Sequence, residues 1–129
     1  MTERFTTGHL DRAPEVTAPD GSAVRPLCVL PGVASFAHFE LAPGQTARAV
    51  SHATVEEIWF AISGAGEMWR RQDGYEEVTV LEPGTCLTIP LGTTFQFRAG
   101  REGLQVVAVT TPPWPTDSPN EARFESGRW

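Results

Sequence analysis

The sequence predicts an all-β fold of the sandwich or small-barrel type, and three observations support this. There are 12 Gly and 11 Pro among 129 residues, which favours many short elements joined by tight turns over a few long helices. Several short segments alternate apolar and polar residues, as half-buried strands do, whereas no stretch keeps a helical period over three turns. The candidate strands also follow one another at close to the 8–12 residue spacing of sandwiches and barrels.

The first strands are bounded by Pro-Gly pairs. Residues 24–30 are mostly apolar and have a composition typical of a strand, which the pair at 31–32 ends. Residues 35–41 alternate around two phenylalanines, and a second pair at 43–44 turns the chain. A short strand over residues 47–52 is expected next.

The strongest strand prediction is the segment VEEIWFAIS at residues 55–63, because β-branched and aromatic residues dominate it. Gly64 and Gly66 follow and are expected to end this strand. The turn pair Asp73-Gly74 divides the next two predicted strands from each other. The remaining strands are expected at residues 67–71, 76–81, 85–89, 93–98 and 104–111.

The chain is predicted to be a single domain with an extension at each end. Residues 1–22 are polar and contain turn residues, so we expect an N-terminal arm. Residues 23–111 form the barrel, and residues 112–129 form a proline-rich tail. The tail carries three large aromatic side chains, Trp114, Phe124 and Trp129. Such side chains seek apolar surface, so the tail is expected to pack on the barrel or on a partner subunit.

Composition excludes several classes of partner. The net charge of −6 provides no attraction for phosphate, so neither nucleic acid nor an anionic membrane is expected as a partner. No apolar run approaches the roughly 20 residues that span a bilayer, and the N-terminal residues lack the apolar core of a signal peptide. Cys28 and Cys86 are far apart, without metal-ligand spacing. Two free thiols in a reducing cytoplasm are therefore expected.

Two segments resemble the paired motifs of the cupin family. The first motif is G-x5-H-x-H-x(3,4)-E-x6-G, and the second is G-x5-P-x-G-x2-H-x3-N. The first is matched by Gly44, His52, Glu57 and Gly64, and the second by Gly84, Pro90 and Gly92. The resemblance covers roughly residues 24–111. It implies a jelly-roll β-barrel, usually dimeric, with a ligand or metal site inside the barrel mouth.

The sequence departs from these motifs at the metal ligands. Val50 stands at the first histidine position, Phe95 at the histidine of the second motif, and Ala99 at its asparagine. Of the four ligands that the resemblance implies, only His52 and Glu57 remain. Catalytic metal sites generally use about three protein ligands, so no metal is favoured. If a divalent metal binds, His52 and Glu57 are its expected ligands.

Strand parity predicts what surrounds these two residues. Residues two apart share a face of a strand, so inward-facing His52 and Glu57 bring further side chains into the interior. The expected lining is Arg48, Val50, Trp59, Phe95 and Phe97. An apolar wall with a few polar groups is typical of a small-molecule pocket. Small barrels are also filled by their own side chains; Trp59 and Phe95 fit either interpretation, and core packing is favoured for Phe97.

A carboxylate inside a barrel is costly unless it is paired, metal-bound or protonated. A His/Glu pair in an apolar pocket can exchange protons with a substrate. The favoured hypothesis is therefore a metal-independent enzyme that catalyses isomerisation, cyclisation or dehydration of an apolar small molecule, with His52 and Glu57 as acid and base. The alternatives are a metal-dependent cupin oxygenase or cyclase and a non-catalytic, metabolite-binding cupin. A homodimer is expected, from the resemblance and from the aromatic tail.

Overall fold

A computed structural model describes residues 4–129, which form an almost entirely antiparallel β-structure. This confirms the predicted all-β class. One 3-10 turn, η1 (Leu10–Arg12), precedes the strands. The strands are β1 (Val16–Thr17), β2 (Ala23–Leu30), β3 (Ala34–Leu41), β4 (Val50–His52), β5 (Glu56–Gln72), β6 (Tyr75–Leu81), β7 (Cys86–Ile89), β8 (Thr94–Thr111) and β9 (Ala122–Phe124).

Two long strands, β5 and β8, form the backbone of the fold. Each combines two of the strands predicted from the sequence, so the expectation that Gly64 and Gly66 end a strand was wrong. The strands pair with each other along most of their length, with register shifts around these glycines. A Cβ on Gly66 would collide with the carbonyl oxygen of Arg98. The glycines therefore allow two paired strands to bend together without a break.

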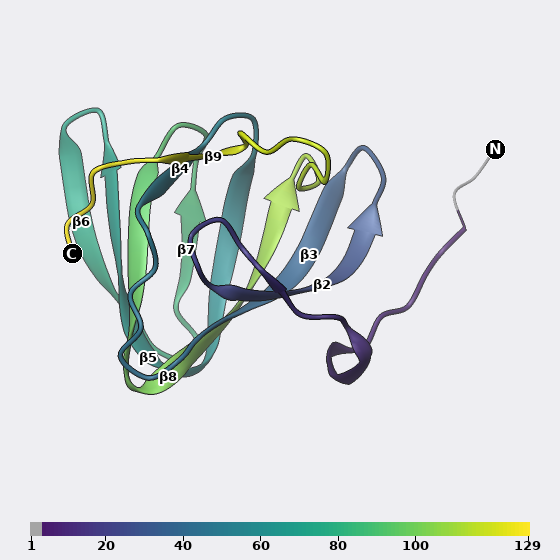
Figure 1. The fold of residues 1–129 in the computed structure, drawn as a ribbon, viewed down its shortest axis with the longest axis horizontal. Helices are drawn as coiled ribbons and strands as arrows, with labels where there is room; N and C mark the ends of the chain where they lie inside the picture. Colours follow the sequence, from purple (N-terminus) through teal and green to yellow (C-terminus); the bar gives the residue numbers. More distant parts are fainter. Residues whose placement is uncertain (1–3) are drawn as a thin grey trace.

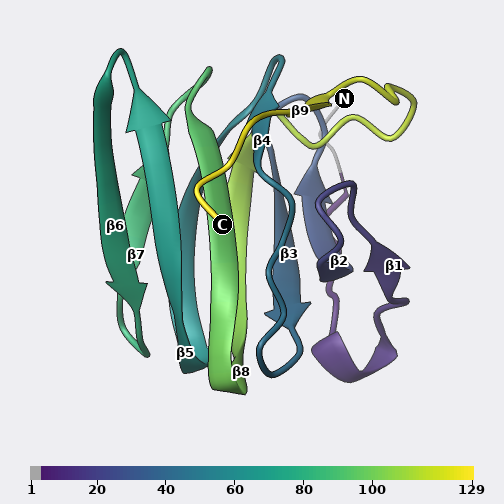
Figure 2. The same cartoon turned by 60° about the vertical axis from the view of Figure 1, so that its left-hand side comes forward.

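The bend divides the strands between two packed sheets. The first half of β5 and the second half of β8 pair with each other, β7 flanks β5, and β3, β2 and β1 extend the sheet beyond β8. The other halves of β5 and β8 join β6 on one side and β4 and β9 on the other. Figure 2 shows β5 and β8 side by side, with β6 and β7 on one side of the pair and β3, β2 and β1 on the other. The result is a cupin-like jelly roll.

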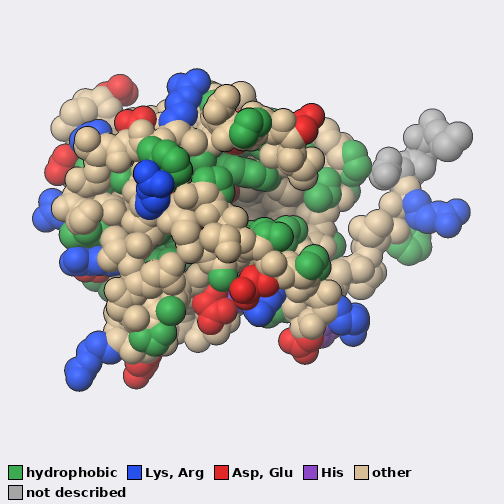
Figure 3. All heavy atoms as spheres, viewed as in Figure 1, with side chains coloured by type: hydrophobic (Ala, Val, Ile, Leu, Met, Phe, Trp, Pro, Cys, Tyr) green, Lys and Arg blue, Asp and Glu red, His purple; other side chains and the backbone are tan. Residues whose placement is uncertain are grey.

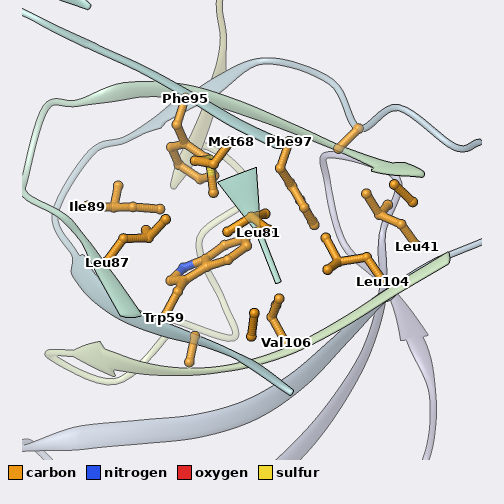
Figure 4. Packing of buried hydrophobic residues seen from close by; sticks show 14 of the residues in the cluster. Leu41, Trp59, Met68, Leu81, Leu87, Ile89, Phe95, Phe97, Leu104 and Val106 are labelled. Carbon is orange, nitrogen blue, oxygen red and sulfur yellow. The ribbon is translucent and has the colours of Figure 1, made fainter. Parts of the chain in front are cut away.

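The hydrophobic core lies between the sheets, around Trp59 of β5. The ring of Phe97 meets the Trp59 ring edge-on at 4.9 Å between centroids, and that of Phe95 does so at 5.9 Å. Figure 4 shows Trp59 among these rings and the aliphatic side chains from both sheets. Aromatic burial of this kind supplies much of the apolar area removed from water on folding.

Parts of both the arm and the tail pack on the barrel. β1 pairs with the edge strand β2, and β9 pairs with β4, so the tail crosses one end of the barrel (Figure 1). The buried amide of Gln96 holds the last residues. Its Oε1 accepts hydrogen bonds from the backbone N–H groups of Arg128 and Trp129, and its Nε2 donates to the carbonyl oxygen of Ala47. Across residues 4–129, no helix is long and apolar enough to cross a bilayer.

Candidate functional site

A cavity of about 240 Å³ opens between the edge of the first sheet, β4, the arm and the tail. Most of its wall is apolar, from strands as well as from the chain ends. The main apolar wall residues are Val24, Phe39, Val50, Trp59, Phe95 and Trp114. Figure 3 shows a hollow bordered by hydrophobic side chains on the face that the arm and tail cross in Figure 1. A mostly apolar concavity with few polar groups is the usual form of a small-molecule site.

Glu57 of β5 places its carboxylate in this cavity, where the residue is only 6% exposed. Its Oε1 accepts a hydrogen bond from the indole N–H of Trp59 at 3.1 Å, and its Oε2 accepts one from the hydroxyl of Thr110 at 2.6 Å. Thr110 lies directly opposite Glu57 in the β5–β8 register. These two donors satisfy the buried carboxylate and hold it in one orientation.

His52, the last residue of β4, lies beside this carboxylate. Its Nδ1 is 3.9 Å from Oε1 of Glu57, too far for a hydrogen bond. Within the described part of the chain, Nδ1 is buried without any hydrogen-bond partner. The rings of Phe95 and Trp114 meet the imidazole edge-on, each at 5.2 Å between centroids. The imidazole therefore has a ring nitrogen that no described protein group pairs, close to a carboxylate.

Several side chains of this site are not predicted from the sequence. Asp20 in the arm, Thr110 in β8 and Trp114 in the tail all line the cavity. The sequence indicates only that Trp114 packs on some surface and that Asp20 belongs to a turn. Neither residue lies in a motif or in an alternating strand that would predict an inward-facing side chain. Both belong to the extensions of the chain, which contact the barrel through tertiary packing alone.

Two residues of the expected lining, Arg48 and Phe97, lie outside the cavity, and for Phe97 this agrees with the core packing that the sequence favours. Arg48 does not line the cavity: it is exposed, and its guanidinium lies 3.5 Å from the centroid of the Phe124 ring. Strand β4 begins only at Val50, so strand parity does not extend back to position 48. Phe97 is fully buried in the core against Trp59 and is not part of the cavity wall. Val50, Trp59 and Phe95 do line the cavity.

The side chains around His52 do not fit a metal centre. Among residues 4–129, no three His, Cys, Asp or Glu side chains are grouped in a way that would hold a metal ion. Val50 and the Phe95 ring occupy the positions where the family pattern has histidines, and the Trp114 ring adds a further apolar contact. Apolar groups neither coordinate a metal nor orient its ligands.

The family model described as "Cupin domain" matches residues 37–111, which include both strands that carry His52 and Glu57. The chain belongs to the cupin family. The match confirms the resemblance inferred from the turn residues and motif spacing. No curated protein matches the sequence significantly.

Solved cupin structures share the fold at low sequence identity. A variant of PAC13 from Streptomyces, solved with uridine, is 11% identical with a TM-score of 0.73, and the match covers 96% of this chain and 92% of that one. KdgF from Halomonas sp. is 15% identical with a TM-score of 0.72, covering 88% and 98%. The coconut allergen cocosin is 24% identical with a TM-score of 0.67, covering 81% and 29%. This chain thus spans about a third or less of cocosin and of CapF from Staphylococcus aureus.

Proposed function

We propose that this cupin catalyses proton transfer on a mostly apolar small molecule, the class of chemistry that includes isomerisation, cyclisation and dehydration. The free Nδ1 of His52 beside the Glu57 carboxylate, in an apolar cavity, is the observation that carries the proposal. One similar structure, PAC13 from Streptomyces, is described with uridine, a small molecule.

The two residues have complementary roles in this proposal. Nδ1 of His52 removes a proton from the ligand or returns one to it. The Glu57 carboxylate, 3.9 Å away, stabilises the imidazolium ion that forms when the proton is taken up. Trp59 and Thr110 hold the carboxylate in place. The apolar wall strengthens these interactions by keeping bulk water out.

Deuterium exchange into 1-indanone, an uncharged apolar ketone, tests this proposal without knowledge of the natural substrate. In deuterated buffer, the wild-type protein should accelerate exchange at the carbon next to the carbonyl, followed by proton NMR. Glu57→Gln keeps the shape of the side chain and removes its charge, and His52→Ala removes the imidazole. Each change should lower the catalysed rate by about 100-fold, the usual contribution of acid–base catalysis.

Glu56→Gln is the matched control, because Glu56 is the exposed neighbour of Glu57 on the same strand. It should exchange at the wild-type rate. Equal rates for wild type and Glu57→Gln would contradict the proposal. Equal rates would favour a metabolite-binding function instead. One observation supports that alternative: both carboxylate oxygens of Glu57 already accept hydrogen bonds from other residues of the protein.

We also propose that the protein works in the cytoplasm. Both cysteines, Cys28 and Cys86, are free and exposed. Exposed thiols persist most readily in a reducing compartment.

A further inference from the structure

A second carboxyl group lies in the cavity wall, away from the cupin motifs. Asp20 belongs to the N-terminal arm, is only 8% exposed and lines the same cavity as His52 and Glu57. Its side chain accepts two hydrogen bonds from Ser22, one from the backbone N–H at 2.9 Å and one from the hydroxyl at 2.7 Å. Both bonds go to Oδ1. The other oxygen, Oδ2, therefore keeps its capacity to accept a hydrogen bond from a bound molecule.

The turn that carries Asp20 is anchored to the barrel. The carbonyl oxygen of Asp20 accepts a hydrogen bond from the backbone N–H of Arg48 at 2.8 Å. The side chain of Gln45 donates to the carbonyl oxygen of Gly21 at 3.0 Å. With the two bonds from Ser22, these contacts fix both the backbone and the carboxyl group. Asp20 is therefore preorganised before a ligand binds, which lowers the entropy lost on binding.

The surroundings of Asp20 determine which ligand groups it accepts. Burial raises the pKa of Asp20, while the hydrogen bonds from Ser22 and the nearby His52 oppose that rise. None of the described residues that line the cavity is Lys or Arg, whereas two of them, Asp20 and Glu57, are acidic. A ligand carboxylate or phosphate would meet two acidic side chains and no Lys or Arg to balance its charge. A hydroxyl or amino group would instead supply the missing donor.

We propose that Asp20 is a specificity-determining residue of this cavity. Its free carboxyl oxygen accepts a hydrogen bond from a hydroxyl or amino group of a mostly apolar ligand that is uncharged or cationic, and the cavity rejects anions. This inference rests on the proposed function in that it places the ligand in the same cavity. It adds the substrate class: an apolar molecule with a hydrogen-bond donor, one end at Asp20 and the reacting atoms beside His52.

Three similar para-substituted ethylbenzenes test whether the cavity prefers a hydrogen-bond donor: 4-ethylphenol, 4-ethylanisole and 4-ethylbenzoate. The phenol carries a donor, the methyl ether only an acceptor, and the benzoate a negative charge. Titrations near pH 7 followed by proton–nitrogen NMR report the affinity of each. The wild-type protein should bind the phenol about tenfold more tightly than the ether, because only the phenol can donate a hydrogen bond to Asp20. The benzoate should bind most weakly.

Asp20→Asn is the decisive variant. Asparagine keeps an oxygen for the Ser22 bonds and replaces the free acceptor by an NH₂ donor. In this variant, 4-ethylphenol and 4-ethylanisole should bind with nearly equal affinity, and 4-ethylbenzoate should bind more tightly than it binds the wild-type protein. Glu57→Gln leaves Asp20 intact and should retain the phenol preference. The melting temperature and circular dichroism spectrum of each variant verify that the fold is kept.

Two results would overturn the inference. One is a wild-type protein that binds none of the probes, or binds phenol and ether equally. The other is a phenol preference that survives Asp20→Asn and disappears in Glu57→Gln, because the donor would then bind at Glu57. Failure of the proposed catalysis is seen separately, as loss of any difference between wild type and Glu57→Gln in the 1-indanone exchange. Probe binding does not depend on that rate.

Discussion

Buried acidic side chains in this protein differ in how the structure satisfies them. Glu57 receives donors from Trp59 and Thr110 on both of its oxygens. Asp20 receives donors on one oxygen only. The second oxygen of Asp20 accepts no hydrogen bond from the described part of the protein, so it can accept one from a ligand. This contrast distinguishes a carboxylate held in position from one available for binding.

Glu121 illustrates the structural role of a buried carboxylate. This tail residue accepts hydrogen bonds from the backbone N–H of Thr54 at 2.7 Å and from the Thr54 hydroxyl. Burial by itself would raise the pKa of Glu121, but the bonds from Thr54 and Val55 and the nearby His52 together hold that pKa below its ordinary value. Glu121 therefore fastens the tail to the turn between β4 and β5 in its ionised form.

This lowered pKa predicts how stability depends on pH. Because the pKa of Glu121 is lower in the folded state, the unfolded state binds the proton more readily. The contribution of Glu121 is therefore complete above the ordinary glutamate pKa and is lost as the pH falls through the folded value. Glu121→Gln should be less stable than wild type near neutral pH, and the difference should narrow as the solution is acidified.

Urea unfolding at several pH values measures this difference. Glu102→Gln is the control, because Glu102 is exposed. A gap between wild type and Glu121→Gln that does not change with pH would refute the prediction.

At the scale of elements, close contact between β5 and β8 depends on small residues at their bend. Gly66 pairs with Ala99, and a Cβ on Gly66 would clash with the backbone of Arg98 rather than with a movable side chain. A backbone carbonyl cannot move without disturbing the strand pairing. Gly100, one residue beyond Ala99, has more space: a Cβ there would lie 3.4 Å from the nearest atom.

Gly66→Ala should therefore destabilise the protein by about 2–3 kcal/mol, the usual cost of forcing atoms into packed space. Gly100→Ala, the matched change on the partner strand, should alter the free energy of unfolding by less than about 1 kcal/mol. Chemical denaturation of both variants makes the comparison. Equal effects at the two positions would show that the bend tolerates a Cβ and that its glycines are not required.

At the scale of the whole molecule, an apolar surface covers the outside of the first sheet. Ile58, Phe60 and Ile62 point outward from the centre of this sheet and are 40–49% exposed, with Phe36 of β3 on the same sheet. Between Ile58 and Ile62 no charged side chain interrupts this row, and Glu56 lies at its end. A second copy related by a two-fold axis would place the apolar centre of this face on the same apolar centre of its partner.

We propose that the protein is a homodimer through this sheet face. Light scattering at micromolar concentration should give twice the mass of one chain, and Phe60→Asp should reduce it to one chain. Val80→Asp is the control, because Val80 is also an exposed apolar residue but lies on β6 in the other sheet. A wild-type monomer, or a dimer that withstands Phe60→Asp, would contradict this arrangement.

The sequence by itself determined the β class, the cupin family and the inward positions of His52 and Glu57, because alternation, turn residues and motif spacing are local patterns. Tertiary structure alone decided the rest. Whether Gly64 and Gly66 end a strand or bend it depends on the partner strand beside them. The same holds for the exposure of Arg48, where strand pairing stops short of the predicted start. Asp20 and Trp114 line the site because the arm and the tail pack against the barrel mouth. Such contacts between distant segments leave no periodic signal in the sequence.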